Sequence, residues 1–152
     1  MKIEGVFQAK GSAQQIWDIL LRPGTLAACV PGAQKIEATD ATTYDCLIKQ
    51  SVGPISVKLK FIVKITEMDP PTHIKAVGTG EALGKMGTFS MTLEVNLKEI
   101  ADGNVEIIYV TDVNLVGKLA TFGERIMRAK AQTESAAFGA NLQKALQSAV
   151  AV

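Results

Sequence analysis

The chain has 152 residues, enough for one domain with a sizeable core, and no linker, repeat or low-complexity segment divides it. Its 16 basic and 15 acidic residues nearly cancel and form no block of like charge, which argues against a nucleic-acid-binding protein. Hydrophobic residues make up 47% of the chain, yet no apolar run is long enough to span a membrane. We therefore expect one soluble domain over residues 1–152.

The N-terminal segment predicts one strand followed by two short helices. Residues 1–8 alternate between apolar and polar, as in a half-buried strand, and lack the apolar centre of a signal peptide. Ser12 and Gln15 have the spacing of a helical capping box. Arg22-Pro23-Gly24 interrupts the helix that they begin, and Pro31-Gly32 ends a second one after about one and a half turns. We expect these two helices to form a V.

The middle of the chain changes to a period of two and predicts an antiparallel sheet. In the clearest strand, Leu59, Phe61 and Val63 alternate with lysines, so one face is buried and the other is solvated. Short segments rich in Gly, Pro, Asp and Asn separate the strands, as in hairpins. Six strands are predicted after the helices, at residues 33–38, 43–50, 55–66, 73–80, 88–100 and 105–115.

The last segment, from about Val116 to Val150, predicts one long helix. Two adjacent stripes of the helix together form one wide face that is expected to meet the sheet, with bulky residues at its ends and small ones in the middle. The first stripe is Leu119, Phe122, Ile126, Ala129, Thr133, Ala137 and Ala140, and the second is Met127, Ala131, Phe138, Leu142 and Ala145. Small side chains there predict a hollow between helix and sheet that an apolar ligand can occupy.

Few residues suggest catalysis or metal binding. Gly78, Gly80, Gly84 and Gly87 do not form a phosphate loop, because a strand and not a helix follows them, so we expect them in a tight or bulged hairpin. His73 is interpreted as an exposed residue at a strand end. One histidine and two distant cysteines are a poor set of metal ligands and suggest a reducing cytoplasm.

The cysteines and carboxylates offer little further chemistry. Cys29 is interpreted as a small buried hydrophobe, since no cation near it in the sequence would lower its pKa. Inward-facing carboxylates are scarce, which argues against acid/base catalysis. Tyr109, Asp112 and His73 are the only polar candidates for a cavity.

Four segments together resemble the G-subunit family of carbon monoxide dehydrogenase, within the START and birch-pollen-allergen-like (polyketide cyclase) superfamily. The segments are residues 21–32 (LRPGTLAACVPG), 52–55 (VGPI), 78–80 (GTG) and 117–125 (GKLATFGER). The resemblance implies an α+β helix-grip fold, in which a seven-stranded antiparallel sheet wraps around a long C-terminal helix and two short helices lie between strands 1 and 2. It carries over no catalytic residue.

The resemblance also implies a role beside a molybdenum-containing carbon monoxide dehydrogenase or a related hydroxylase, in assembly, membrane recruitment or electron delivery. A quinone or other lipid is the expected cavity ligand, and no other cofactor or metal is expected. Some family members have a C-terminal extension suited to membrane attachment, whereas this sequence ends at Val152. The expected location is therefore the cytoplasm, with at most peripheral contact at the inner face of the membrane.

The sequence thus predicts a non-enzymatic binder of an apolar ligand. Entry is expected between the second short helix and the hairpin at residues 84–87, with Leu83 and Met86 as a mobile lip. Two alternatives stay open: a cyclase or aromatase using the same cavity, and a solid-cored interaction module without a ligand. The residues expected to line the cavity are Leu26, Val30, Leu59, Phe61, Met91, Leu93, Tyr109, Phe122, Ile126 and Ala137.

Overall fold

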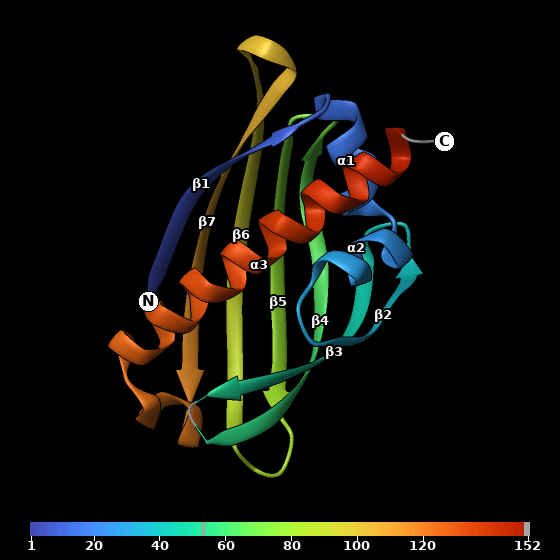
Figure 1. Cartoon of the computed structure of the whole chain (residues 1–152). Coiled ribbons are helices and arrows are strands. Elements are labelled where there is room, and N and C mark those ends of the chain that lie inside the picture. Colours follow the sequence, from blue (N-terminus) through green and yellow to red (C-terminus); the bar gives the residue numbers. More distant parts are fainter. Residues whose placement is uncertain (53, 151–152) are drawn as a thin grey trace.

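One curved antiparallel sheet and one long helix dominate the computed structural model, which describes residues 1–52 and 54–150 (Figure 1). The sheet has seven strands in the order β1-β7-β6-β5-β4-β3-β2. Helix α3 crosses its concave face diagonally, and α1 and α2 lie beside the C-terminal half of α3 (Figure 1). This is the predicted helix-grip fold.

The strands and helices follow the predicted order. The strands are β1 Lys2–Lys10, β2 Ala33–Asp40, β3 Thr43–Val52, β4 Ile55–Asp69, β5 His73–Ala82, β6 Gly87–Ile100 and β7 Asn104–Val116. The helices are α1 Ala13–Leu21, α2 Pro23–Cys29 and α3 Glu124–Val150, with 3-10 turns η1 Ala101–Gly103 and η2 Gly117–Phe122. Gly53, in the predicted turn between β3 and β4, lies outside the described residues.

The two short helices begin where the sequence predicts. The Ser12 hydroxyl accepts the Gln15 N–H at 3.1 Å, and the Gln15 side chain accepts the Ser12 N–H at 2.9 Å, which completes the capping box. Pro23 occupies the first turn of α2, where its missing N–H costs no helical hydrogen bond. These local signals set where each helix begins, and α1 then packs on β6 and α3 while α2 packs on β2 and α3.

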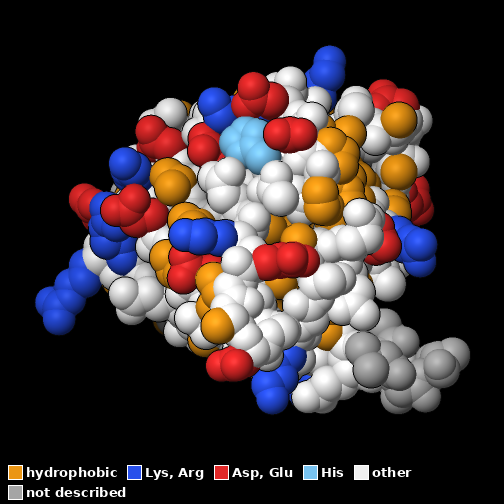
Figure 2. Space-filling model, turned by 90° about the horizontal axis from the view of Figure 1, so that it is seen from above, with side chains coloured by type: hydrophobic (Ala, Val, Ile, Leu, Met, Phe, Trp, Pro, Cys, Tyr) orange, Lys and Arg blue, Asp and Glu red, His pale blue; other side chains and the backbone are white. Residues whose placement is uncertain are grey.

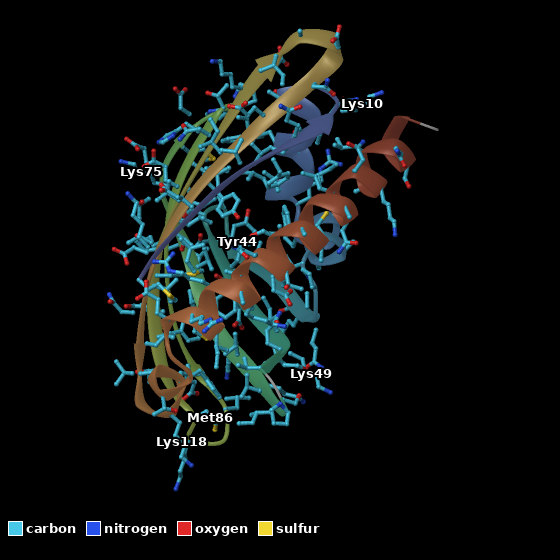
Figure 3. All side chains as sticks on the ribbon, turned by 60° about the vertical axis from the view of Figure 1, so that its left-hand side comes forward. Lys10, Tyr44, Lys49, Lys75, Met86 and Lys118 are labelled. Atoms are coloured by element: carbon cyan, nitrogen blue, oxygen red, sulfur yellow. The ribbon has the colours of Figure 1, made fainter. Side chains whose placement is uncertain are left out.

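The two faces of the sheet differ as the alternation predicts. Val57, Phe61 and Ile65 of β4 are buried, whereas the lysines between them are exposed. Figure 3 shows Tyr44 in the space between the sheet and the helices, where its hydroxyl donates to the Leu21 carbonyl at 2.9 Å. Lys75 lies on the opposite, convex face (Figure 3).

The prediction that α3 begins near Val116 is wrong. The structure has the 3-10 turn η2 at Gly117–Phe122, and the α-helix starts only at Glu124. Gly117 and Gly123 both have φ near +84°, a left-handed conformation that an α-helix cannot include. Helix α3 therefore has 27 residues, and η2 is a separate connection across the end of the sheet.

Only part of the wide face predicted on α3 meets the sheet. Leu142 and Leu146 are fully buried, and Phe138 packs edge-on against Phe7 of β1 with ring centroids 6.3 Å apart. Met127, Ala131 and Ala145 continue this line along the helix, so the second predicted stripe is confirmed. In the first stripe, the prediction is wrong for Ile126, Ala129, Thr133 and Ala140, which are exposed because they lie on the flank of the helix away from the sheet.

Candidate functional site

The concave face of the sheet is sealed at one end and partly exposed at the other. Near the β6–β7 hairpin, Leu97, Val105 and Ile107 are buried under α1 and the C-terminal half of α3. Farther along the same strands the inward side chains are only partly buried. This second region is called the open half of the grip, and its inward apolar residues are Phe89, Met91, Leu93, Val113, Leu115, Met127 and Ala131.

Most of the predicted lining residues lie on the concave side. Leu59, Phe61, Met91 and Tyr109 come from the sheet, with Phe61 and Phe89 packed edge-on at 5.6 Å between centroids. Leu26 and Val30 lie on or just after α2 and pack against the buried core. The remaining residues are the partly buried Leu93, Phe122 and Ala137, and the misplaced Ile126, whose side chain is 50% exposed.

Tyr109 is the predicted polar residue that the structure places inside. Its ring lies between sheet and helix, 6.3 Å from the Phe7 ring, and its hydroxyl donates to the Ser135 Oγ of α3 at 2.7 Å. A hydroxyl pair on the inner face can orient a ligand oxygen or a reacting group. Ser135 was not predicted, because serine in a helix gives no signal of its own.

An ion pair on the inner side of α3 was also missed. Lys130 Nζ lies 2.7 Å from Glu134 Oε1, and both side chains are only about a quarter exposed, at 26% and 27%. Glu134 lies between Ala131 and Phe138, the two members of the sheet-facing stripe that are seven residues apart. That gap in the 3–4 spacing was the available signal, since residues 134 and 135 both fall between these two on the sheet-facing side.

His73 and Asp112, the other two polar candidates, lie on the convex face. His73 contacts Glu67 Oε2 through Nε2 at 2.9 Å and Asn96 Oδ1 through Nδ1 at 2.7 Å. Figure 2 shows the histidine among acidic and basic side chains. The hydrogen bond with Glu67 raises the pKa of His73, and the same bond lowers the pKa of Glu67. Asp112 is 62% exposed and pairs with the N-terminal ammonium at 3.3 Å.

Both cysteines are buried and unsuited to chemistry. Cys29 is fully buried at the end of α2, and desolvation raises the pKa of its thiol. Burial, with a smaller contribution from Asp45, raises the pKa of Cys46 to about 11. The thiolate is the reactive form, so Cys29 behaves as the small hydrophobe that was predicted.

The hairpin between β5 and β6 has the tight geometry that its glycines predicted. Gly84, Lys85 and Gly87 have φ between +61° and +128°, and a Cβ at Gly87 would overlap the Val116 carbonyl oxygen. Leu83 is 38% exposed beside this turn. The hairpin is joined to η2 by the Leu119 N–H, which donates to the Met86 carbonyl at 2.8 Å. Figure 3 shows Met86 and Lys118 together at this end of the molecule.

Two of the surface hollows in the described part of the chain lie outside the predicted cavity. One, of about 590 Å³, lies along α3 beside Glu124, Arg125, Arg128, Ala129 and Gln132. The other, of about 240 Å³, lies mainly on the convex face of β5, β6 and β7, around Val77, Thr79, Ser90 and Asn114. A ligand cavity in the open half therefore stays a proposal.

Residues 1–52 and 54–150 hold neither a membrane-spanning helix nor a cluster of metal ligands. No described helix combines the length and apolarity needed to cross a membrane. Within the same residues, no three His, Cys, Asp or Glu side chains are grouped so that they could hold a metal ion.

Comparison with solved structures places the fold among known proteins. A conserved protein from Geobacillus kaustophilus is 23% identical with a TM-score of 0.89, covering 97% of this chain and 96% of that one. The Zhui aromatase/cyclase from Streptomyces sp. R1128 is 13% identical (TM-score 0.72; 99% and 95% covered). A START superfamily protein from Mycobacterium smegmatis is 9% identical (TM-score 0.71; 97% of each chain covered). At these identities the likeness concerns the fold alone.

Comparison of the sequence itself gives the family. No curated protein matches the chain. The family model for the G-subunit of carbon monoxide dehydrogenase (CoxG) matches residues 5–147, nearly the full length. The match includes all four segments in which the resemblance was seen. This chain therefore belongs to the CoxG family of carbon monoxide dehydrogenase subunits.

Proposed function

We propose that this chain binds an apolar ligand, a quinone or another lipid, between the sheet and α3, and that it does so as a carrier without catalytic activity. The observation that supports this most is the partly exposed apolar lining of the open half, because an ordinary core would bury those side chains. Burial of the ligand in this region would contribute about 25 cal/mol per Å² of apolar surface, before the costs of association.

The partner proposed for this carrier is a molybdenum-containing carbon monoxide dehydrogenase or a related hydroxylase. Membership of the family supports the association, and a bound quinone would suit electron delivery from such an enzyme. The carrier would work in the cytoplasm, with at most peripheral contact at the inner face of the membrane. Binding of the purified enzyme to the immobilised chain is the direct test, and absence of binding at micromolar concentrations would remove the partner from the proposal.

The ligand itself is tested by native mass spectrometry of protein purified without detergent, followed by solvent extraction. The expected result is a quinone or lipid at near-stoichiometric occupancy. A bare protein mass, unchanged after incubation with quinones and fatty acids, would contradict the carrier and favour a solid-cored interaction module. Ala131→Trp should abolish uptake because it fills the sheet-facing side of α3, whereas Ala136→Trp, on an exposed position of the same helix, should leave uptake unchanged.

A cyclase-type enzyme is the second candidate, because two polar pairs lie on the inner side of α3. These are Tyr109 with Ser135, and Lys130 with Glu134. An enzyme would convert a polyketide-like substrate and lose turnover in Tyr109→Phe while still binding it. A carrier would release its ligand chemically unchanged, so product analysis separates the two functions.

A further inference from the structure

One polar atom on the inner side of α3 has no partner among residues 1–52 and 54–150. Glu134 Oε1 pairs with Lys130, but Glu134 Oε2 is excluded from solvent and accepts no hydrogen bond from any residue that the structure describes. Leaving a carboxylate oxygen desolvated and unpaired is costly, more so than for a neutral group. An atom of this kind calls for a partner from outside the chain.

This ion pair is expected to contribute little to stability. The order in the sequence, lysine before glutamate, is the less favourable one for an i,i+4 pair on a helix. The pair Glu124 and Arg128 has the favourable order and lies exposed at the start of the same helix. A partly buried ion pair also loses hydration, so replacing it by apolar residues is often neutral or stabilising.

The pair lies where the sealed core ends and the open half begins. One turn farther along α3, Phe138 packs against Phe7 in the region that narrows toward the core. The neighbouring Ser135 is joined to Tyr109 of β7, and Ala131 and Met127 continue over the open half. A ligand that enters the open half therefore meets Glu134 at the inner end of its path.

We propose that Lys130 and Glu134 bind the polar head of an amphiphile that enters head-first, and that this head is a neutral hydroxyl donating to Glu134 Oε2. The proposal rests on the proposed carrier function and names its ligand class: a long-chain alcohol or a phenol, including the hydroquinone form of a quinone. A carboxylate head would be repelled by Glu134, so fatty acids are disfavoured.

The test measures displacement of the neutral dye N-phenyl-1-naphthylamine by 1-tetradecanol and by tetradecanoate at pH 8. The wild-type protein should prefer the alcohol. Glu134→Leu should bind the alcohol at least about ten-fold more weakly, the size expected for a lost hydrogen bond to a charged group, and should still bind the dye. Glu124→Leu, which removes an exposed carboxylate of the same helix, is the matched control and should change neither affinity.

A second variant keeps the test decisive if Glu134→Leu folds poorly. Glu134→Gln keeps the side-chain shape but removes the negative charge, so it should bind tetradecanoate more tightly than the wild type does. Unchanged alcohol affinity in Glu134→Leu, or unchanged tetradecanoate affinity in Glu134→Gln, would overturn the head-group assignment while dye binding still supported the carrier. Failure of the wild-type protein to bind the dye and both amphiphiles would overturn the carrier function itself.

Discussion

Tyr109 of β7 lies over Gly5 of β1, the residue directly opposite it in the sheet. A Cβ added at Gly5 would overlap the hydroxyl end of the Tyr109 ring. Only glycine at this position allows the ring to lie flat across β1 and its hydroxyl to reach Ser135 on α3. The missing side chain on one strand thus sets the direction of a polar group on its neighbour.

Gly5→Ala is expected to displace the Tyr109 ring and to lower the free energy of unfolding by about 1–3 kcal/mol, because overpacking distorts the neighbouring side chains. Urea unfolding measures the change. In a double-mutant cycle, Tyr109→Val should recover part of the loss, since it removes the ring that clashes. Gly24→Ala is the control, because no atom lies within 4 Å of the added Cβ in α2 and a helical alanine is favourable. If the effects of Gly5→Ala and Tyr109→Val on stability simply added, the close contact between these two residues would be contradicted.

His73 should make stability depend on pH in the range near neutrality. Both ring nitrogens point at acceptors, Glu67 Oε2 and Asn96 Oδ1, and the Asn96 amide is oriented by its donation to Glu94 Oε1 at 3.3 Å. This arrangement favours the doubly protonated imidazolium, so the pKa of His73 is higher in the folded state than the unfolded value of 6.5. The stabilisation of the folded state by protonated His73 is fully present below pH 6.5 and is lost as the pH rises through the folded pKa.

The measurement compares urea unfolding of the wild type and of His73→Gln at pH 5.5 and pH 8.5. The stability difference between the two proteins should shrink at the higher pH. Glu67→Gln should reduce this pH dependence, because Glu67 is the largest cause of the raised pKa, while Lys75 and Glu94 complete the charges facing the histidine. Equal differences at both pH values would show that folding does not shift the pKa of His73, which would contradict the hydrogen-bond arrangement described for it.

The period of two and the capping and turn residues were enough to predict the order of the helices and strands, whereas the helix-grip arrangement came from the resemblance to the family. Phe61 inward and Lys60 outward follow from alternation alone, and Ser12 with Gln15 marks the start of α1. The start of α3 was not predicted, because the apolar spacing continues through Gly117 and Gly123 even though their backbone is left-handed. Periodicity indicates which residues would share a helical face. It does not indicate at which residue the backbone torsions become helical.

The candidate site was only partly predictable. Leu59, Phe61 and Met91 were found because alternation in a strand decides the face of every residue. On α3, two adjacent stripes carried similar small residues, so the sequence alone did not distinguish Ile126 from Met127. Glu134 was overlooked because a charged residue is expected on the solvated face, and the gap between Ala131 and Phe138 was the one sequence signal against that expectation.

Cys29 and Cys46 should resist thiol reagents in the folded protein. Burial raises the pKa of Cys46 from about 9 to about 11, which lowers its thiolate fraction at pH 8 about 100-fold before steric exclusion is considered. Alkylation by iodoacetamide should therefore be slow in native buffer and rapid for both thiols in guanidinium chloride, as followed by intact mass. Rapid native labelling of either cysteine would show that the region around α2 opens readily in solution.

The ion pair of Lys130 and Glu134 should be dispensable for stability. Lys130→Met leaves the Glu134 carboxylate partly buried without its cation, so the free energy of unfolding of this variant should fall by about 1 kcal/mol or more. The loss should be smaller than for a fully buried pair, because both side chains keep about a quarter of their exposure. The double variant Lys130→Met/Glu134→Leu removes both charges from the sheet-facing stripe and should be as stable as the wild type or more stable. Thermal and urea unfolding of the three proteins provide the comparison. A double variant less stable than the wild type would mean that the pair supports the fold, and Glu134 would then need no ligand to explain its position.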